Sequence, residues 1–141
     1  MPKALIIGVS GQDGAYLSKS LLDNGYQVFG ASREVYNNDF ANLKSEKVFD
    51  KISVLPLNPG RFSEVFELVK KTEPDEIYNL AGQSSVGQSF ARPLETIESI
   101  TCSAVNLLEA VRILGGKIRF YSTVSGECFG GTDFPADECT P

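Results

Sequence analysis

The sequence predicts an α/β fold: a doubly wound parallel sheet with helices on both faces, in three layers. Two observations support this prediction. Short, nearly continuous apolar runs alternate with amphipathic helical patterns along the whole chain. A glycine-rich loop also stands between the first apolar run and the first helical pattern. The 141 residues are 42% hydrophobic, which is typical of a globular chain, and we expect residues 1–141 to form one domain.

Five segments have the pattern of strands buried on both faces: residues 3–8, 27–31, 52–57, 76–81 and 117–123. Helical patterns lie between them. The first helix ends at Gly25, a second starts near Phe62 and is closed by Pro74, and a long third helix starts at Pro93 and ends at Gly115-Gly116.

The remaining segments are polar and less regular. Residues 33–47 predict a loop with a short helix, and residues 130–141 predict a loop. No terminal element is predicted to cover the sheet, so we expect the fold to be incomplete on its C-terminal side. Strand–helix alternation further predicts right-handed crossovers.

Composition narrows the function classes. A net charge of −5 without a basic patch disfavours nucleic-acid binding, and the absence of histidine removes the commonest metal ligand and general base. The cysteines, Cys102, Cys128 and Cys139, lack metal-ligand spacing and are expected to be reduced thiols. No apolar run approaches the ~18 residues of a membrane span, and no secretory signal precedes the first strand, so we expect a cytoplasmic protein.

The glycine-rich loop, from Gly8 to Gly14, has the spacing G-x-x-G-x-x-G. Gly8 would permit a tight turn, Gly11 would let the backbone approach a pyrophosphate, and Gly14 would let the helix pack close to the strand. The alternative is a glycine-rich turn without a ligand. Because the loop follows a strand and opens a helix, its context favours dinucleotide binding.

The end of the second strand bears on which dinucleotide binds. NAD-preferring sites usually place a carboxylate here, for the ribose 2′-hydroxyl, but this sequence has Arg33. A guanidinium suits a 2′-phosphate, which favours NADP, although Glu34 would repel that phosphate and a solvated arginine is the alternative. NADP is therefore the predicted cofactor and NAD stays open.

The loop spacing resembles that of extended short-chain dehydrogenases/reductases. Within them, Gly-Val-Ser-Gly-Gln-Asp-Gly-Ala-Tyr-Leu (8–17) and Ile-Tyr-Asn-Leu-Ala-Gly-Gln-Ser-Ser-Val-Gly-Gln-Ser-Phe (77–90) resemble GDP-mannose 4,6-dehydratases. The resemblance covers essentially the whole chain but only the N-terminal part of such enzymes. It implies a Rossmann-type fold, a nucleotide-sugar substrate, GDP-mannose above others, and a homo-oligomer, dimer or tetramer.

The resemblance also implies site residues. Arg33 falls where the family has an arginine for NADP, and Ser84 matches a serine beside the sugar pocket. Asn58 replaces an aspartate that contacts adenine. The other implied cofactor residues lie in the loop or pass the ribose and nicotinamide: Gly8, Gly11, Gln12, Asp13, Gly14, Leu80, Ala81 and Gln83.

Two further residues carry the implied chemistry. Ser125 matches the family's catalytic Ser/Thr, which hydrogen-bonds the sugar C4 oxygen. Glu127 matches the base that takes the C5 proton, after C4 is oxidised by hydride transfer to NADP, and then helps water leave from C6 before the hydride returns there. Taken from the residues alone, the pair is better explained as a strand-end hydroxyl and a solvated loop carboxylate, because Ser-x-Glu by itself is not a motif.

Several departures from the family keep alternatives open. Pro59-Gly60-Arg61 alters the turn after Asn58, Ser103-Ala104 replaces Gly-Thr, and residues 34–42 lack the family's basic charge. No tyrosine in the chain is followed by lysine in a Tyr-x-x-x-Lys pair, so we expect these residues alone to be inactive. The alternatives are another extended short-chain epimerase or reductase, and a non-catalytic dinucleotide-binding module.

Overall fold

The computed structural model describes residues 1–131 and 133–140, with the backbone alone at Gly126 and Glu127. Five parallel strands form one sheet in the order β3-β2-β1-β4-β5. Their bounds are β1 (Lys3–Ile7), β2 (Gln27–Ser32), β3 (Ser53–Pro56), β4 (Glu76–Asn79) and β5 (Arg119–Ser122). The strand order reverses between β1 and β4, and in a doubly wound sheet the crevice at this reversal is where ligands bind.

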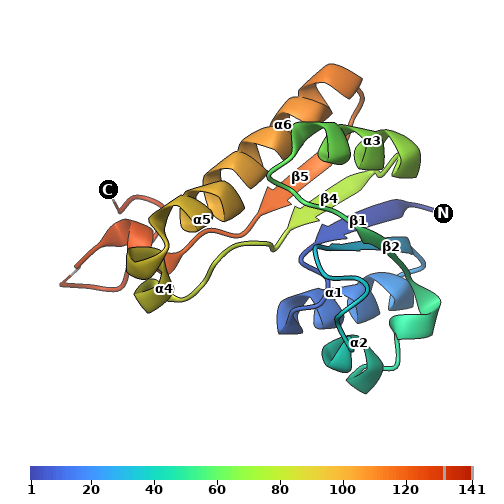
Figure 1. Ribbon diagram of the computed structural model, residues 1–141, viewed down its shortest axis with the longest axis horizontal. Helices are drawn as coiled ribbons and strands as arrows, with labels where there is room; N and C mark the ends of the chain where they lie inside the picture. The colour runs from blue at the N-terminus through green and yellow to red at the C-terminus, as the bar shows by residue number, and fades with distance from the viewer. Residues whose placement is uncertain (132, 141) are drawn as a thin grey trace.

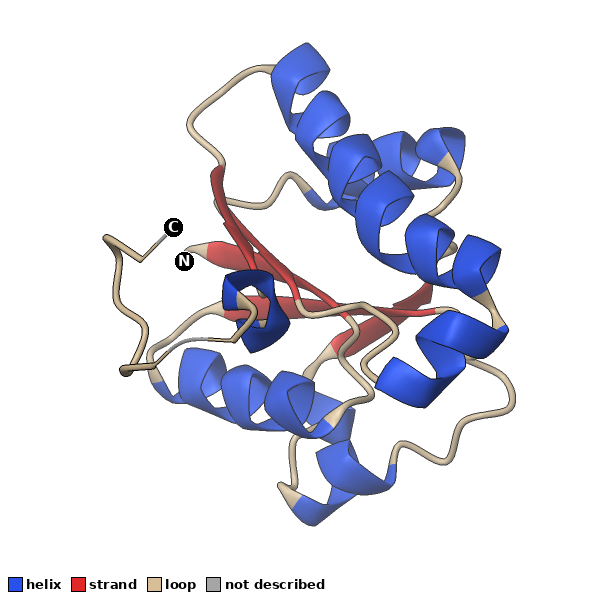
Figure 2. Cartoon of the chain, turned by 90° about the vertical axis from the view of Figure 1, so that its left-hand side faces the viewer, coloured by secondary structure: helices blue, strands red, loops and turns tan. Residues whose placement is uncertain are grey.

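Helices cover both faces of the sheet. Helices α1 and α2 lie on one side of it, and α3 and α6 lie on the other (Figure 1; Figure 2). The bounds are α1 (Gln12–Asp23), α2 (Ala41–Ser45), α3 (Phe62–Thr72), α4 (Val86–Ala91), α5 (Pro93–Ile97) and α6 (Ser103–Leu114), with 3₁₀ turns η1 (Phe49–Lys51) and η3 (Gly126–Phe129). The predicted three-layer α/β architecture is therefore confirmed.

Each face of the sheet has its own apolar core, because successive side chains of a strand point to opposite faces. Leu5 and Ile7 of β1 belong to the core under α3 and α6, whereas Ala4 and Ile6 belong to the core under α1 and α2. All four side chains are buried. The first strand is thus apolar throughout because it is enclosed from both sides, as the sequence predicts.

The helix ends also follow the sequence. Gly25 after α1 and Gly115 after α6 have positive φ, 79° and 67°, which glycine adopts without the steric penalty that a side chain would bring. Pro74 follows the end of α3, where Glu73 takes a positive φ of 45°. Each predicted stop is confirmed.

The single long helix predicted from Pro93 is wrong in its detail. The chain is helical from Pro93 to Leu114, but a π-helical turn, η2 (Glu98–Cys102), separates α5 from α6. No residue of α5 or η2 is buried, while α6 buries Ser103, Leu107 and Ala110. The wider π turn changes which face meets the sheet, and an apolar pattern counted at one fixed period does not register that change. Helix α4, capped by Ser85, was not predicted at all.

In the part of the chain that the structure describes, no helix combines the length and the apolarity that crossing a bilayer requires.

Candidate functional site

The loop from Gly8 to Gly11 lies at the carboxyl edge of the sheet, against the end of β4. Gly8 has φ +87°, and a Cβ there would stand 3.0 Å from the Ala81 nitrogen and 3.1 Å from the Leu80 carbonyl carbon. The Gly8 N–H donates to the Ala31 carbonyl oxygen at 3.0 Å. A side chain at position 8 would therefore both strain the turn and separate the loop from β4.

The third glycine of the loop brings α1 close to the loop. A Cβ on Gly14 would lie 2.7 Å from the Gly8 oxygen and from the Val9 Cα, which are backbone atoms that cannot move away cheaply. Gly11 is the N-cap of α1, and no side chain caps the helix there. The first N–H groups of α1 and its positive dipole end are thus left for an anion beside the loop.

Gly30 of β2, which the sequence did not single out, packs against the glycine-rich loop. A Cβ on Gly30, in the middle of β2, would lie 2.7 Å from both γ-methyl groups of Val9, which is fully buried. Gly30 therefore makes room for the side chain that anchors the loop to the sheet. A glycine inside a strand signals such a close approach and could have identified it.

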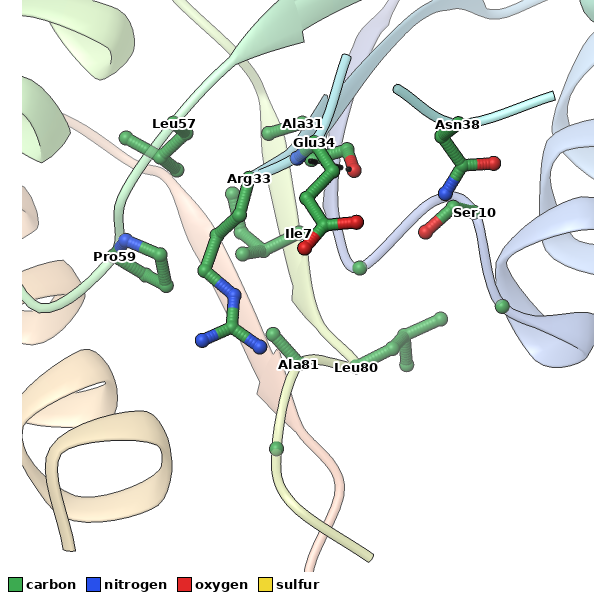
Figure 3. A pocket seen from close by; sticks show the side chains of 14 residues that line it. Ile7, Ser10, Ala31, Arg33, Glu34, Asn38, Leu57, Pro59, Leu80 and Ala81 are labelled. Atoms are coloured by element: carbon green, nitrogen blue, oxygen red, sulfur yellow. Dashed lines mark hydrogen bonds between the residues drawn. The ribbon is translucent and has the colours of Figure 1, made fainter. Parts of the chain in front are cut away.

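A cavity of about 360 Å³ opens beside the loop, at the reversal between β1 and β4. Four separate stretches of the chain contribute to it, and Figure 3 shows their side chains around one hollow. Of the predicted cofactor residues, Gly8, Gly11, Arg33, Leu80 and Ala81 line it. Its other lining residues are Ile7, Ser10, Ala31, Ser32, Glu34, Asn38, Leu57, Pro59 and Gly82.

Arg33 and Glu34 both reach into this cavity from the end of β2. The Arg33 guanidinium extends between Pro59 and Ala81, and the Glu34 carboxylate lies in the same hollow (Figure 3). Within the described residues, no ion pair engages Arg33. The Arg33 guanidinium could therefore attract an anionic ligand into the cavity, while the Glu34 carboxylate would repel one.

Asn58 lies beside the cavity rather than in its lining, although its neighbours Leu57 and Pro59 line it. Its Oδ1 accepts from the Gly60 N–H at 3.0 Å, and its own N–H donates to Glu64 at 2.9 Å. The asparagine therefore shapes the turn after β3. Among the described residues, no hydrogen bond engages its side-chain nitrogen, Nδ2.

The remaining predicted cofactor and substrate residues stand outside the cavity. Gln12 lines a small hollow between α1 and α2, and Asp13 is exposed in the first turn of α1. The Gln83 side chain folds onto the backbone of Ser85, donating to its oxygen at 2.8 Å and accepting from its N–H. Ser84 is exposed. The structure therefore brings the loop, Arg33 and the start of the 80–84 stretch together, and leaves these four at the periphery.

The predicted catalytic pair follows β5, at the same carboxyl edge. The Thr123 N–H donates to the Asn79 carbonyl oxygen at 3.0 Å, which continues the β4–β5 pairing. The backbone carbonyl oxygen of Ser125 accepts from the Cys128 N–H at 3.2 Å. Ser125 is exposed and directly precedes η3. The backbone of Glu127 lies in η3, and its side chain is outside the described part of the structure.

The strongest electrostatic perturbation lies at the opposite, amino edge of the sheet. Glu76 at the start of β4 accepts hydrogen bonds from Tyr26 at 3.0 Å and, more closely, from Tyr78 and Arg119. These contacts, that of Tyr78 first, hold the pKa of Glu76 below its ordinary value, while burial and then the Glu76 contact raise the pKa of Tyr78 to about 12. The cluster joins β4 to the segment before β2 and to β5, which is a structural role away from the cavity.

The described residues contain no group of histidine, cysteine or carboxylate side chains arranged to hold a metal ion. The cavity is lined by loop backbone, by apolar side chains and by five polar or charged side chains: Ser10, Ser32, Arg33, Glu34 and Asn38.

Comparison with known proteins places these features in a family. The profile of the GDP-mannose 4,6 dehydratase family matches residues 5–141. The GDP-mannose 4,6-dehydratase of Yersinia enterocolitica is 41% identical, over 100% of this chain and 40% of that protein. GDP-mannose 4,6 dehydratase 1 of Arabidopsis thaliana is 38% identical, over 98% of this chain and 41% of that protein. The chain thus spans about two fifths of the length of these relatives.

Solved structures agree on the fold. A UDP-Glc/GlcNAc 4-epimerase from Campylobacter jejuni superposes with a TM-score of 0.86 at 19% identity, covering 100% of this chain and 43% of that one. A UDP-glucose 4-epimerase from Bifidobacterium longum, solved in complex with NAD+ and UDP, gives 0.83 at 22% identity, covering 99% and 42%. At these identities the likeness shows a Rossmann-type fold and nothing finer.

Proposed function

The chain belongs to the GDP-mannose 4,6-dehydratase family, and from that premise we propose that residues 1–141 form the dinucleotide-binding domain of an NADP-dependent GDP-mannose 4,6-dehydratase. Membership of this family supports a nucleotide-sugar dehydratase or epimerase type of function. The cofactor, the sugar nucleotide and the residue roles are the proposal. The observation that carries it is the cavity at the strand reversal, lined by Gly8, Gly11 and Arg33.

The residues of this cavity fit a dinucleotide. Backbone atoms of the loop and of β4 meet at Gly8 with no room for a side chain, and α1 begins beside them without a side-chain cap. A diphosphate would accept from the free N–H groups there and gain from the helix dipole. Leu57 and Ala81 supply apolar surface for an adenosine.

Arg33 supports NADP over NAD. Among the described residues that line the cavity, its guanidinium is the one cation, and a 2′-phosphate would give it a charged partner. Glu34 beside it would weaken that preference through repulsion. The proposed cofactor is therefore NADP, with NAD as the competitor to be measured against it.

The proposed chemistry falls to Ser125 and Glu127 at the carboxyl end of β5. The cavity lined by Gly8, Gly11 and Arg33 would hold the dinucleotide, whose chemistry there would be to take a hydride from the sugar C4 and give it back at C6. The C4 hydroxyl proton would pass to the tyrosine of the family's Tyr-x-x-x-Lys pair, which these residues lack, and a proton would add to C5 as the hydride adds to C6. Ser125 would donate a hydrogen bond to the C4 oxygen. Glu127 would take the C5 proton and deliver a proton to the departing C6 hydroxyl. A carboxylate that must both take and give a proton works best with a pKa near the operating pH.

Glu127→Gln tests this assignment, because glutamine keeps the size of the side chain and loses the base. In the full-length protein we expect the formation of the 4-keto-6-deoxy product from GDP-mannose to fall by about 10²–10⁴-fold, while NADP+ affinity measured by calorimetry stays unchanged. Glu138→Gln, at an exposed glutamate elsewhere in the C-terminal segment, is the control and should leave both unchanged.

Three outcomes would contradict parts of the proposal. Unchanged turnover in Glu127→Gln would remove that residue from the chemistry. An absence of heat with millimolar NADP+ would remove the cofactor assignment. Tight NADP+ binding by a full-length protein that leaves GDP-mannose unchanged would favour the second candidate, a dinucleotide-binding module.

A further inference from the structure

Asn38 lies on the rim of the cavity and is absent from the residues that the sequence singles out. Its side chain lines the hollow together with Ser10 and Arg33. In Figure 3 the Asn38 amide nitrogen points toward Ser10, on the side of the cavity opposite to the Arg33 guanidinium. The rim therefore carries polar groups from the phosphate loop, from the end of β2 and from the segment before α2.

The orientation of the Asn38 amide is determined by its neighbours. Its Oδ1 accepts from the Phe40 N–H at 2.8 Å. Phe40 is buried and stacks on Phe49, with 5.3 Å between the ring centroids, so this anchor belongs to the core. An amide group that flipped would turn its NH₂ toward an N–H donor and lose the bond. Nδ2 is consequently held as a donor on the side that faces Ser10 and the cavity.

A second hydrogen bond connects the glycine-rich loop to α2. Nδ2 of Asn42, in α2, donates to the backbone carbonyl oxygen of Ser10 at 3.0 Å. Among the described residues, no hydrogen bond engages Nδ2 of Asn38. A prearranged donor on one side of a cavity, with a cation that no described ion pair engages on the other side, is suited to an anion between them.

We propose that Asn38 is a second determinant of cofactor choice, donating from Nδ2 to the 2′-phosphate of NADP; this rests on the proposed dinucleotide function. A phosphate reached from both sides would offset the repulsion from Glu34. NAD carries a hydroxyl at the same carbon and would gain much less, because hydrogen bonds to charged acceptors are about twice as strong as those to neutral ones.

Asn38→Asp tests the inference. Aspartate is isosteric and can still accept from the Phe40 N–H, but it presents a charged acceptor where Nδ2 was a donor. We expect the Kd for NADP+, measured by calorimetry, to rise by about tenfold or more, and the Kd for NAD+ to change by less than about twofold. Asn38→Ser keeps an oxygen that can accept from the Phe40 N–H, adds no charge, and withdraws the donor from the cavity because its side chain is shorter. It should weaken NADP+ binding several-fold, and it keeps the test valid if the aspartate variant does not fold.

Asn37→Asp is the matched control, because Asn37 is exposed, adjacent and outside the cavity lining. Equal losses of NADP+ affinity in Asn37→Asp and Asn38→Asp would mean that the effect comes from net charge alone, and would overturn the inference. The inference would also be overturned if Asn38→Asp lowered the affinities for NAD+ and NADP+ equally, or if it bound NADP+ as tightly as the wild type does. A wild type that binds neither dinucleotide would instead overturn the proposed function, and the inference with it.

Discussion

Gly14 and Gly87 both lie near the starts of helices, yet an added methyl group would meet very different surroundings at the two positions. At Gly14 it would press on backbone atoms of Gly8 and Val9 at 2.7 Å, whereas at Gly87 nothing lies within 4 Å. Neither residue has a positive φ, so backbone strain does not distinguish them. The requirement for glycine at position 14 is one of space between α1 and the loop.

We therefore predict that Gly14→Ala lowers the free energy of unfolding by about 1–3 kcal/mol, as overpacking does. Gly87→Ala should be neutral or stabilising by up to about 1 kcal/mol, since alanine is the better helix former. Urea unfolding of the two variants beside the wild type measures both. Similar stabilities for the two would show that α1 can withdraw from the loop at little cost.

At the scale of elements, the amino ends of β4 and β5 are joined by one carboxylate. Glu76 is buried and accepts from Tyr26, Tyr78 and Arg119, which come from three different segments. These donors favour ionised Glu76, and that carboxylate in turn favours neutral Tyr78. The arrangement stabilises the sheet within a pH range bounded by these two ionisations.

The sign of the pH dependence follows from the two shifts. Tyr78 has a raised pKa, so its contribution is complete below the ordinary value of 10.0 and is lost as the pH rises toward about 12. Glu76 has a lowered pKa, so its contribution is complete above the ordinary 4.5 and is lost as the pH falls below it. We predict that the free energy of unfolding declines on both sides of this range.

The substitution Tyr78→Phe isolates the contribution of Tyr78 to the pH dependence of stability from the contributions of the other ionisable groups. Phenylalanine cannot ionise, so the decline between pH 10 and 12 should be smaller in the variant than in the wild type when chemical unfolding is followed across that range. Parallel profiles for the two proteins would mean that Tyr78 titrates alike in the folded and unfolded chains.

At the scale of the whole molecule, the cavity exists only in the folded chain. Its lining comes from residues 7–11, 31–38, 57–59 and 80–82, which are adjacent in space and distant in sequence. A ligand that needs all four stretches binds the native state and has no comparable site on the unfolded chain. Binding and folding are then thermodynamically linked.

We predict that NADP+ at 100 times its Kd raises the free energy of unfolding by about 2.7 kcal/mol. Urea unfolding with and without the cofactor measures this gain, and AMP at the same concentration controls for partial occupancy by the adenosine half. Unfolding midpoints that do not move at a concentration shown by calorimetry to saturate the protein would place the binding site outside the folded cavity.

The sequence by itself determined the layered α/β class, the five strands, the helix stops at Gly25, Gly115 and Pro74, and the family. These features depend on local patterns: apolar runs, glycine punctuation and a short motif that keeps its spacing. It also located five of the residues that line the cavity, because the loop and the strand ends meet at one edge of a parallel sheet.

Only the tertiary structure decided which neighbours complete that edge. It added Asn38 and Ser10 to the cavity, turned Asn58 toward Gly60, and placed Val9 over Gly30. It also replaced a uniform helix with one that contains a π turn. The cavity lining and the Val9–Gly30 packing depend on contacts between segments distant in the chain, and local periodicity carries no record of which side chains such contacts bring together.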